Sequence, residues 1–253
     1  MKFCVLASGS KGNCILVESR NCRVLVDVGL SAREIERRLQ RIDTDPTTID
    51  AIVLTHAHND HVRGVGVFSR RFGVPVHGHP ETLDSINRLL RPEQELHCWN
   101  DPFTIKDLTF KPFPVSHDCV PTVGYLIDEN GRRLALCTDL GVVTEEVKSN
   151  IRTAQAMLLE SNHDPDMLMN GPYPWHLKER ISSRVGHLSN HNTGELLQEI
   201  LHPGLRKVVL GHLSENNNTP DLARETVCDY LSYQAESLID VIEQKSVSRL
   251  YDV

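Results

Sequence analysis

Four side chains that can bind a metal ion lie within six consecutive residues: His56, His58, Asp60 and His61. They follow Ile52–Leu54, a short apolar run that predicts a buried strand. In an extended or tightly turned loop alternate residues project the same way, so His56 and His58 can reach one ion. Asp60 and His61 lie beyond the turn, near a second ion. Imidazole and carboxylate suit zinc, iron or manganese, and the absence of thiolate disfavours a purely structural zinc site.

The composition is that of an ordinary globular protein that is rich in histidine. The 253 residues include 13 histidines, and the net charge is −7. This charge argues against a protein that binds nucleic acid through a broad basic surface. It does not exclude a nuclease, because two bound divalent ions would add positive charge where a phosphate must sit.

The cysteines and the apolar runs indicate the compartment. The seven cysteines are widely spaced and include no Cys-x-x-Cys pair, which disfavours a disulfide framework and a tetrathiolate zinc site. No apolar run is long enough to span a bilayer, and the N-terminal residues do not follow the pattern of a secretion signal. We therefore expect a cytoplasmic protein with reduced thiols and no membrane association. The oligomeric state stays open.

The hydrophobic pattern predicts the elements that must position these residues. We expect strands at Phe3–Ala7, Cys14–Glu18, Arg23–Val28, Ile52–Leu54, Val74–His77, Val123–Asp128, Arg133–Cys137, Ala156–Glu160 and Lys207–Leu210. We expect helices from Ser31, at 62–72, Pro80–Leu90, Thr144–Ala154, Leu177–Ser183, Asn192–Leu201 and Pro220–Gln234, and a loop at Pro165–Pro174. Asn130-Gly131 predicts a hairpin. Hairpin-linked strands mixed with helices indicate an α+β fold, in a single domain of residues 1–253.

The segment 56–61 resembles the His-x-His-x-Asp-His signature of the metallo-β-lactamase superfamily, and the resemblance extends over nearly the whole chain. Asp27, His117, Asp139 and His212 match the other acidic and histidine positions of this family, each at an expected strand end. The resemblance implies an αββα four-layer sandwich, in which two mixed β-sheets are flanked by helices.

The resemblance also implies a role for each residue. His56, His58 and His117 would bind one metal ion, Asp60, His61 and His212 would bind the other, and Asp139 would bridge them. Asp60 would thereby belong to the catalytic residues as well. Asp27 would orient a ligand histidine through its free ring N–H. The implied cofactors are two divalent ions, Zn, Mn or Fe, and a hydroxide that bridges them would attack the substrate.

Asp139 and two later segments narrow the class of hydrolase. The best-known zinc β-lactamases lack the bridging carboxylate, so Asp139 disfavours a true β-lactamase. Glu160 and His187 occupy the relative places of two segments that serve proton transfer at the leaving oxygen in the tRNA 3′-processing branch. A phosphodiester needs such a group, because an alkoxide is a poor leaving group. His163 is a further candidate for a substrate contact.

Several motifs together resemble the YycJ/WalJ group of bacterial metallo-hydrolases, which is associated with exonuclease activity on DNA. They are the Ser8–Asn13 turn, the segments 160–164 and 186–190, and Gly171-Pro-Tyr-Pro. Lys11 and Asn13 lie in the first of these motifs. They are candidate substrate contacts, with an ordinary solvated turn as the alternative.

The leading hypothesis is a dinuclear metal-dependent phosphodiesterase, an exonuclease whose partner is nucleic acid, with DNA favoured over RNA. The interval from Asp139 to His212 leaves no room for the inserted domain of β-CASP nucleases, and no long Gly/Pro-rich arm for gripping tRNA is evident. The acidic net charge favours the alternative, a small-molecule hydrolase such as a cyclic phosphodiesterase or a glyoxalase-like thioesterase. A metal-holding scaffold without activity is the third hypothesis.

Overall fold

Two mixed β-sheets form the centre of the computed structural model, which describes residues 1–119, 121–231 and 237–253. The first sheet contains, from edge to edge, β14 (Tyr251–Asp252), β1 (Lys2–Ala7), β2 (Cys14–Glu18), β3 (Arg23–Val26), β4 (Ala51–Val53), β5 (Val76–Gly78) and β6 (Leu96–Cys98). Its strands pair antiparallel from β14 to β3 and parallel from β3 to β6.

The second sheet also combines parallel and antiparallel strands. It contains β13 (Ile239–Val241), β12 (Lys207–Gly211), β11 (Ala156–Glu160), β10 (Arg132–Cys137), β9 (Val123–Glu129), β8 (Leu108–Pro114) and β7 (Phe103–Ile105). Pairing is parallel from β13 to β10 and antiparallel from β10 to β7. The hairpin between β9 and β10 turns at Asn130 and Gly131, both with positive φ, as the Asn-Gly pair predicts.

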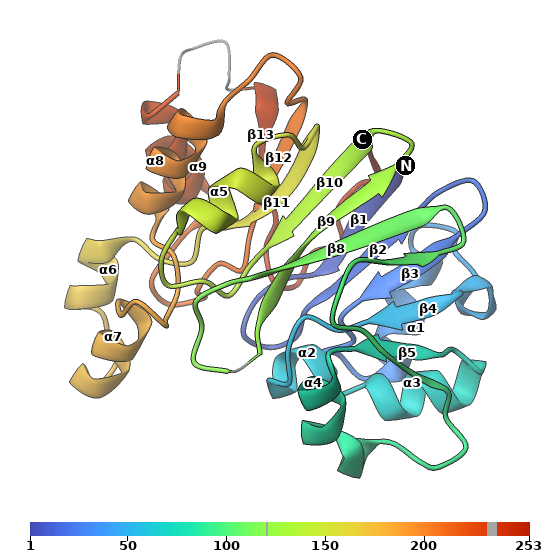
Figure 1. The fold of residues 1–253 in the computed structure, drawn as a ribbon. Helices are drawn as coiled ribbons and strands as arrows, with labels where there is room; N and C mark the ends of the chain where they lie inside the picture. Colours follow the sequence, from blue (N-terminus) through green and yellow to red (C-terminus); the bar gives the residue numbers. More distant parts are fainter. Residues whose placement is uncertain (120, 232–236) are drawn as a thin grey trace.

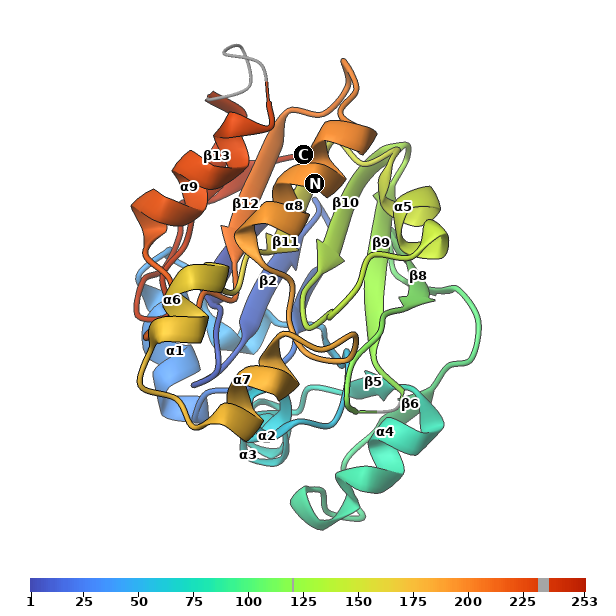
Figure 2. The ribbon, with the colours of Figure 1, turned by 90° about the vertical axis from the view of Figure 1, so that its left-hand side faces the viewer.

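Helices cover the outer faces of both sheets and complete four layers (Figure 1, Figure 2). On the first sheet lie α1 (Ala32–Gln40), α2 (Asn59–Val62), α3 (Val65–Phe72) and α4 (Pro80–Ser85), with the 3-10 turns η1 (Pro46–Thr48) and η2 (Asn87–Leu89) nearby. On the second lie α5 (Glu145–Ile151), α8 (Asn190–Ile200) and α9 (Pro220–Asp229). The pair α6 (Pro165–Asn170) and α7 (Trp175–Ile181) lies at the edge of the molecule. The αββα class expected from the resemblance is confirmed.

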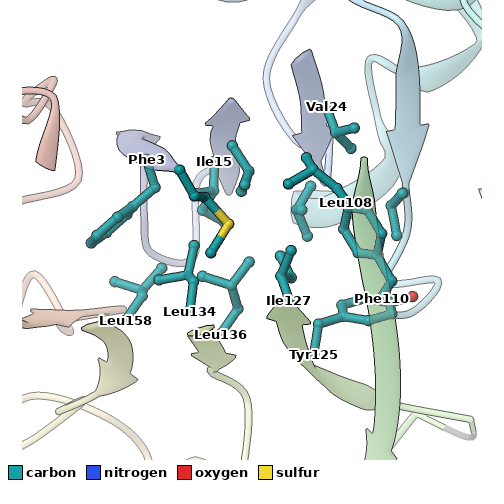
Figure 3. Packing of buried hydrophobic residues seen from close by; sticks show 14 of the residues in the cluster. Phe3, Ile15, Val24, Leu108, Phe110, Tyr125, Ile127, Leu134, Leu136 and Leu158 are labelled. Atoms are coloured by element: carbon teal, nitrogen blue, oxygen red, sulfur yellow. The ribbon is translucent and has the colours of Figure 1, made fainter. Parts of the chain in front are cut away.

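Alternation of side chains along the strands explains why the central strands are apolar on both faces. In β1, Phe3 and Val5 enter the core between the sheets, whereas Cys4 and Leu6 face the helices. In Figure 3 Phe3, Ile15 and Val24 of the first sheet face residues of the second, including Leu158. Because helices cover the outer faces, both faces of these strands are withdrawn from water.

Two expected helices are each divided in the structure. The expected helix at 62–72 is α2 and α3, separated at Gly64. A Cβ at Gly64 would lie 2.0 Å from the carbonyl oxygen of Leu30, so the chain passes too close to that loop for any other residue. The expected helix at Pro80–Leu90 ends at Ser85 as α4, and η2 follows as a tighter turn.

Other expected boundaries were wrong for local reasons. Pro165–Asn170 is helix α6 rather than loop, because the side chain of Asp164 accepts a hydrogen bond from the N–H of Met167 and Pro165 fits the first turn. The expected helix Pro220–Gln234 ends at Asp229, and its last residues, 232–234, lie outside the described residues. The strand β6 was not expected. Among the described helices, none combines the length and the apolar character that crossing a membrane requires.

Candidate metal centre

Most of the candidate ligands lie just beyond the carboxyl ends of four strands. His56 and His58 follow β4, His117 follows β8, Asp139 follows β10 and His212 follows β12. Strands that end at the same edge bring the residues that follow them together, although these residues are far apart in the sequence. Asp60 and His61 belong to the short helix α2, which begins directly after the histidine pair.

Three residues of this edge have a left-handed backbone. The φ angles are 61° at Asp27, 60° at Asp139 and 55° at His212. Asp27 and Asp139 are of a type that visits this region with some ease, but for histidine the conformation is uncommon and costs free energy. The turn it produces ends each strand abruptly. For this reason β3 stops at Val26, two residues before its expected end.

Two sets of candidate ligands converge, and they match the sets that the resemblance implies. His56, His58 and His117 form one set and Asp60, His61 and His212 the other; within each set, one ligand atom of every residue lies within 4.8 Å of the others. Asp139 spans the two. Its Oδ2 lies 3.4 Å from His61 Nε2, and its Oδ1 lies 3.4 Å from His212 Nε2 and 3.9 Å from His117 Nε2.

The opposite ring nitrogens of these histidines are held by neighbouring groups. Asp27 Oδ2 accepts a hydrogen bond from His61 Nδ1 at 2.7 Å, and both Asp27 oxygens accept from Thr55. The carbonyl oxygen of Gly186 accepts from His117 Nδ1 at 3.1 Å. A proton on Nδ1 leaves Nε2 of each ring as a lone-pair donor toward the centre, which is the form that ligates a metal.

Three buried atoms of the cluster make no hydrogen bond to any described residue: His56 Nε2, His212 Nε2 and Asp139 Oδ2. A buried polar atom without a partner is costly, so a group of them requires an explanation. Two imidazole nitrogens and a carboxylate oxygen are ligands that divalent ions of the first transition series accept. The donor set therefore fits metal ions.

The charges of the cluster favour a cation. Burial raises the pKa of Asp139, but His212 and His61 outweigh this effect and hold the pKa below its usual value. Burial also raises the pKa of Asp60, but the neighbouring imidazoles of His212 and His61 outweigh this effect, so this pKa is lowered as well. Burial lowers the pKa of His61, yet Asp139 and Asp27 raise it to about 9. The carboxylates thus stay ionised at neutral pH, and a cation bound at His61 would displace a proton.

Glu160 links a candidate ligand to His187. Its Oε1 accepts hydrogen bonds from His187 Nδ1 at 2.8 Å and from His212 Nδ1 at 2.7 Å, and its Oε2 accepts from the N–H groups of Leu140 and Leu188 at 2.9 Å and 3.3 Å. Glu160 is fully buried, and its lone pairs are occupied by these donors. We interpret it as an anchor for both rings rather than as a further metal ligand. His187 keeps Nε2 on the other side of its ring and lines the cavity.

The structure places the three candidate substrate contacts away from the cavity wall. Lys11 is exposed and forms an ion pair with Glu215. Asn13 is buried beneath the centre, where its Nδ2 lies 2.8 Å from His61 Nε2 and its backbone N–H donates to the carbonyl oxygen of Asp60. His163 is buried, and burial lowers its pKa to about 4. Asn13 thus supports the ligand loop, and contact with substrate stays a hypothesis for Lys11.

Sequence reasoning missed Thr55 and the pair of Asp118 with Arg180. Thr55 holds Asp27 through its N–H and its hydroxyl. Asp118 follows the ligand His117, and its Oδ2 lies 2.5 Å from Arg180 Nε on α7. The position of Asp118 next to His117 could have indicated a role in the site. Its partner Arg180 lies 62 residues away, and no local pattern reveals that pairing.

Replacement of Asp27 by asparagine is expected to lower metal affinity about 10- to 100-fold, the usual effect of losing a partner of a ligand histidine. Asparagine tolerates the left-handed backbone, but it has only one acceptor oxygen. Its NH2 group would therefore face either the N–H of Thr55 or the donors Thr55 Oγ1 and His61 Nδ1. Competition with a chromophoric chelator measures the affinity. Asp43→Asn is the matched control, because Asp43 is exposed and has a similar φ of 53°. Equal affinities in the two variants would contradict a positioning role.

Fold and site together define a metal-dependent hydrolase, and comparison with known proteins agrees. A family model described as the β-lactamase superfamily domain matches residues 22–213, a range that includes every candidate ligand. The chain belongs to the metallo-β-lactamase superfamily. Its fold is similar to the crystal structure of the metallo-β-lactamase fold protein YhfI from Bacillus subtilis, with a TM-score of 0.74, 15% identity and coverage of 98% and 99% of the two chains.

Within this superfamily the chain is similar to two proteins named as exodeoxyribonucleases. It is 35% identical to YycJ of Bacillus anthracis over 235 residues, which are 91% of this chain and 89% of that protein. It is also 35% identical to WalJ of Streptococcus pneumoniae over 237 residues, which are 91% of this chain and 88% of that protein. The resemblance expected from the motifs is thus confirmed at the level of the whole chain.

Proposed function

We propose that this protein is a phosphodiesterase with two divalent metal ions that degrades DNA as an exonuclease. The observation that carries the proposal is the Glu160–His187 pair beside the candidate metal centre, in which Nδ1 of His187 lies 2.8 Å from Oε1 of Glu160. A thioester hydrolase has less need of a proton donor, since a thiolate leaves more easily than the alkoxide of a nucleotide.

The two converging ligand sets would hold the ions, with Asp139 between them. Bound Zn, Mn or Fe would supply a water acidified toward neutral pH and a Lewis acid for the phosphoryl oxygens. The protein fixes the imidazole rings through Asp27, Gly186 and Glu160, so the nitrogens that face the centre need no reorganisation.

His187 is the proposed general acid. The carboxylate of Glu160 accepts a hydrogen bond from Nδ1 and fixes the ring, so that a proton on Nε2 can be donated to the leaving oxygen. Burial raises the pKa of Glu160, but His187 and His212 hold it well below its usual value, so Glu160 stays an anion throughout. The product alcohol then leaves neutral.

DNA is proposed as the substrate because both relatives named above are exodeoxyribonucleases and together support a nucleic-acid substrate. The second candidate, a small phosphodiester or thioester, is favoured by the net charge of −7 and by a cavity of only about 270 Å³ at the site. The negative net charge repels a polyanion at long range, so the bound ions would have to supply the attraction for DNA.

A gel assay of manganese- and zinc-loaded protein on end-labelled single- and double-stranded DNA and RNA tests the proposal. We expect stepwise shortening of DNA, which would also reveal the polarity. Hydrolysis of a thioester without cleavage of any polynucleotide, in protein with metal confirmed bound, would overturn the proposal and favour the second candidate. Faster shortening of RNA than of DNA would overturn the choice of substrate.

A further inference from the structure

One wall of the metal cavity is apolar and is built by α7 and the turn before it. The cavity is lined by candidate ligands and His187 on the one hand, and by Tyr173, Leu177, Arg180 and Ile181 on the other. Leu177, Arg180 and Ile181 are spaced i, i+3 and i+4, so they share one face of α7. None of these four residues has a part in holding the ions or in the proton transfer proposed above.

Tyr173 is held in a fixed orientation. It lies between Pro172 and Pro174, and a residue before proline is restricted to extended conformations. Its hydroxyl oxygen accepts a hydrogen bond from Asn216 Nδ2 at 2.9 Å. The Gly171-Pro-Tyr-Pro motif, which the metal chemistry leaves unexplained, therefore presents a preorganised aromatic ring to the cavity at little entropic cost.

The rest of the wall is anchored at both ends. Lys178 is buried and donates from Nζ to the carbonyl oxygen of Met169 at 2.7 Å, which ties α7 to α6. Beyond α7, Ser116 Oγ donates to the carbonyl oxygen of Arg184 at 2.8 Å. The N–H of His187 donates to the carbonyl oxygen of Ile181 at 2.9 Å, so the wall and the proposed acid are directly joined. These hydrogen bonds tie the wall to α6 and to the segment that carries the proposed acid.

We propose that Tyr173, Leu177 and Ile181 bind the nucleoside next to the scissile phosphate, so that the site recognises one unpaired nucleotide unit of a single strand. This inference rests on the proposed phosphodiesterase activity and adds its substrate class. Two aliphatic side chains and one aromatic ring line the same cavity as the candidate ligands, which two bound ions would make cationic. Such a cavity complements a nucleotide, whose base is flat and apolar and whose phosphate is anionic. Arg180 of the same wall is ion-paired with Asp118, so the positive charge that attracts the phosphate would have to come from the bound ions.

The size of the cavity supports a single strand. About 270 Å³ is slightly below the range of about 300–1,000 Å³ that is usual for pockets that enclose a drug-sized ligand. One nucleotide unit approaches that size, whereas a base pair with its stacked neighbours greatly exceeds it. A duplex would therefore have to unpair its terminal nucleotide before the phosphate could reach the ions.

The test compares thymidine 5′-phosphate with deoxyribose 5-phosphate, which lacks only the base. Both are measured as inhibitors of methyl p-nitrophenyl phosphate hydrolysis by the manganese-loaded protein, and by calorimetric binding to the same protein. We expect thymidine 5′-phosphate to bind about tenfold more tightly, as one stacked base does elsewhere. In Tyr173→Ala and Leu177→Ala this advantage should fall below about twofold, whereas Tyr173→Phe should retain it.

Trp175→Ala is the matched control, because Trp175 lies two residues before Leu177 on the opposite face of α7 and is 60% exposed. It should keep the full preference for the base, and thermal melting verifies that every variant folds. Equal binding of the two phosphates to the wild type, or an unchanged preference in Tyr173→Ala, would overturn the inference. Failure of the proposed activity is distinguishable, since the ester would then not be hydrolysed while calorimetry would still report the preference.

Discussion

Asp139→Ala is expected to lower hydrolysis by at least about 10³-fold and to reduce the bound metal. Loss of a single electrostatic contact to a transition state costs about 10²–10³-fold, and Asp139 serves both ligand sets at once. Its two oxygens lie 3.4 Å from His61 and His212, so its removal also takes away the negative charge between two buried imidazoles. The affinity of both ions should therefore fall together.

The shortening of end-labelled DNA and the metal content by mass spectrometry are measured on the same preparations. Asp229→Ala, at the exposed end of α9, is the control and should match the wild type in both. Addition of manganese should raise the melting temperature of the wild type, because a ligand stabilises only the state that binds it. The rise should be smaller in Asp139→Ala. Full activity with Asp139 absent would exclude it from the centre.

His187→Ala is expected to lower kcat about 10²–10⁴-fold on DNA but less than about tenfold on methyl p-nitrophenyl phosphate. The alkoxide of a nucleotide needs a proton as it leaves, whereas nitrophenolate leaves without one. Metal content should be unchanged, because Nδ1 of His187 is engaged by Glu160 and the ring lies outside both converging sets. The contrast between the two leaving groups separates an acid from a merely structural residue.

His191→Ala is the matched control, an exposed histidine on α8 that contacts Tyr230. It should leave both reactions unchanged. Loss of a metal ion from His187→Ala would instead make His187 a ligand, consistent with its closeness to Asp139 and His212. An equal loss on both substrates, with metal retained, would refute proton donation to the leaving oxygen.

The residues of the candidate metal centre were largely predictable, because two local patterns mark them. The segment 56–61 concentrates ligand types in one loop, and Asp139 and His212 follow apolar runs that had to be strands. The grouping of these residues into two ligand sets was implied only by the resemblance to the metallo-β-lactamase superfamily, because the ligands follow strands of two different sheets. The pairing of His187 with Glu160 was expected only from resemblance, and the geometry now places the two in contact.

The parts that escaped prediction depend on contacts between distant segments. Asp118 meets Arg180, and Gly64 divides α2 from α3 only because the carbonyl of Leu30 lies against it. Asn13 resembled a surface turn residue, yet the fold buries it under Asp60. Short strands such as β6, only three residues long, carry too little periodicity to be distinguished from loop.

The wall of α7 illustrates the same limit from the functional side. The Gly171-Pro-Tyr-Pro motif was conspicuous in the sequence, but nothing local indicates that Tyr173 reaches a cavity whose candidate ligands are more than 30 positions away along the chain. Even the helix that follows was expected two residues late, at Leu177 rather than Trp175. Only the structure shows which face of α7 lines the cavity, namely the face that carries Leu177, Arg180 and Ile181.

The left-handed backbone at Asp27, Asp139 and His212 bears on how this enzyme can be engineered. Each such residue outside glycine costs about 1–3 kcal/mol, in a protein class whose total stability is about 5–15 kcal/mol. Laboratory evolution that selects for heat resistance alone would therefore enrich glycine at these three positions and discard the candidate centre. A screen for a thermostable variant should score turnover in every round, and libraries should leave these codons unchanged.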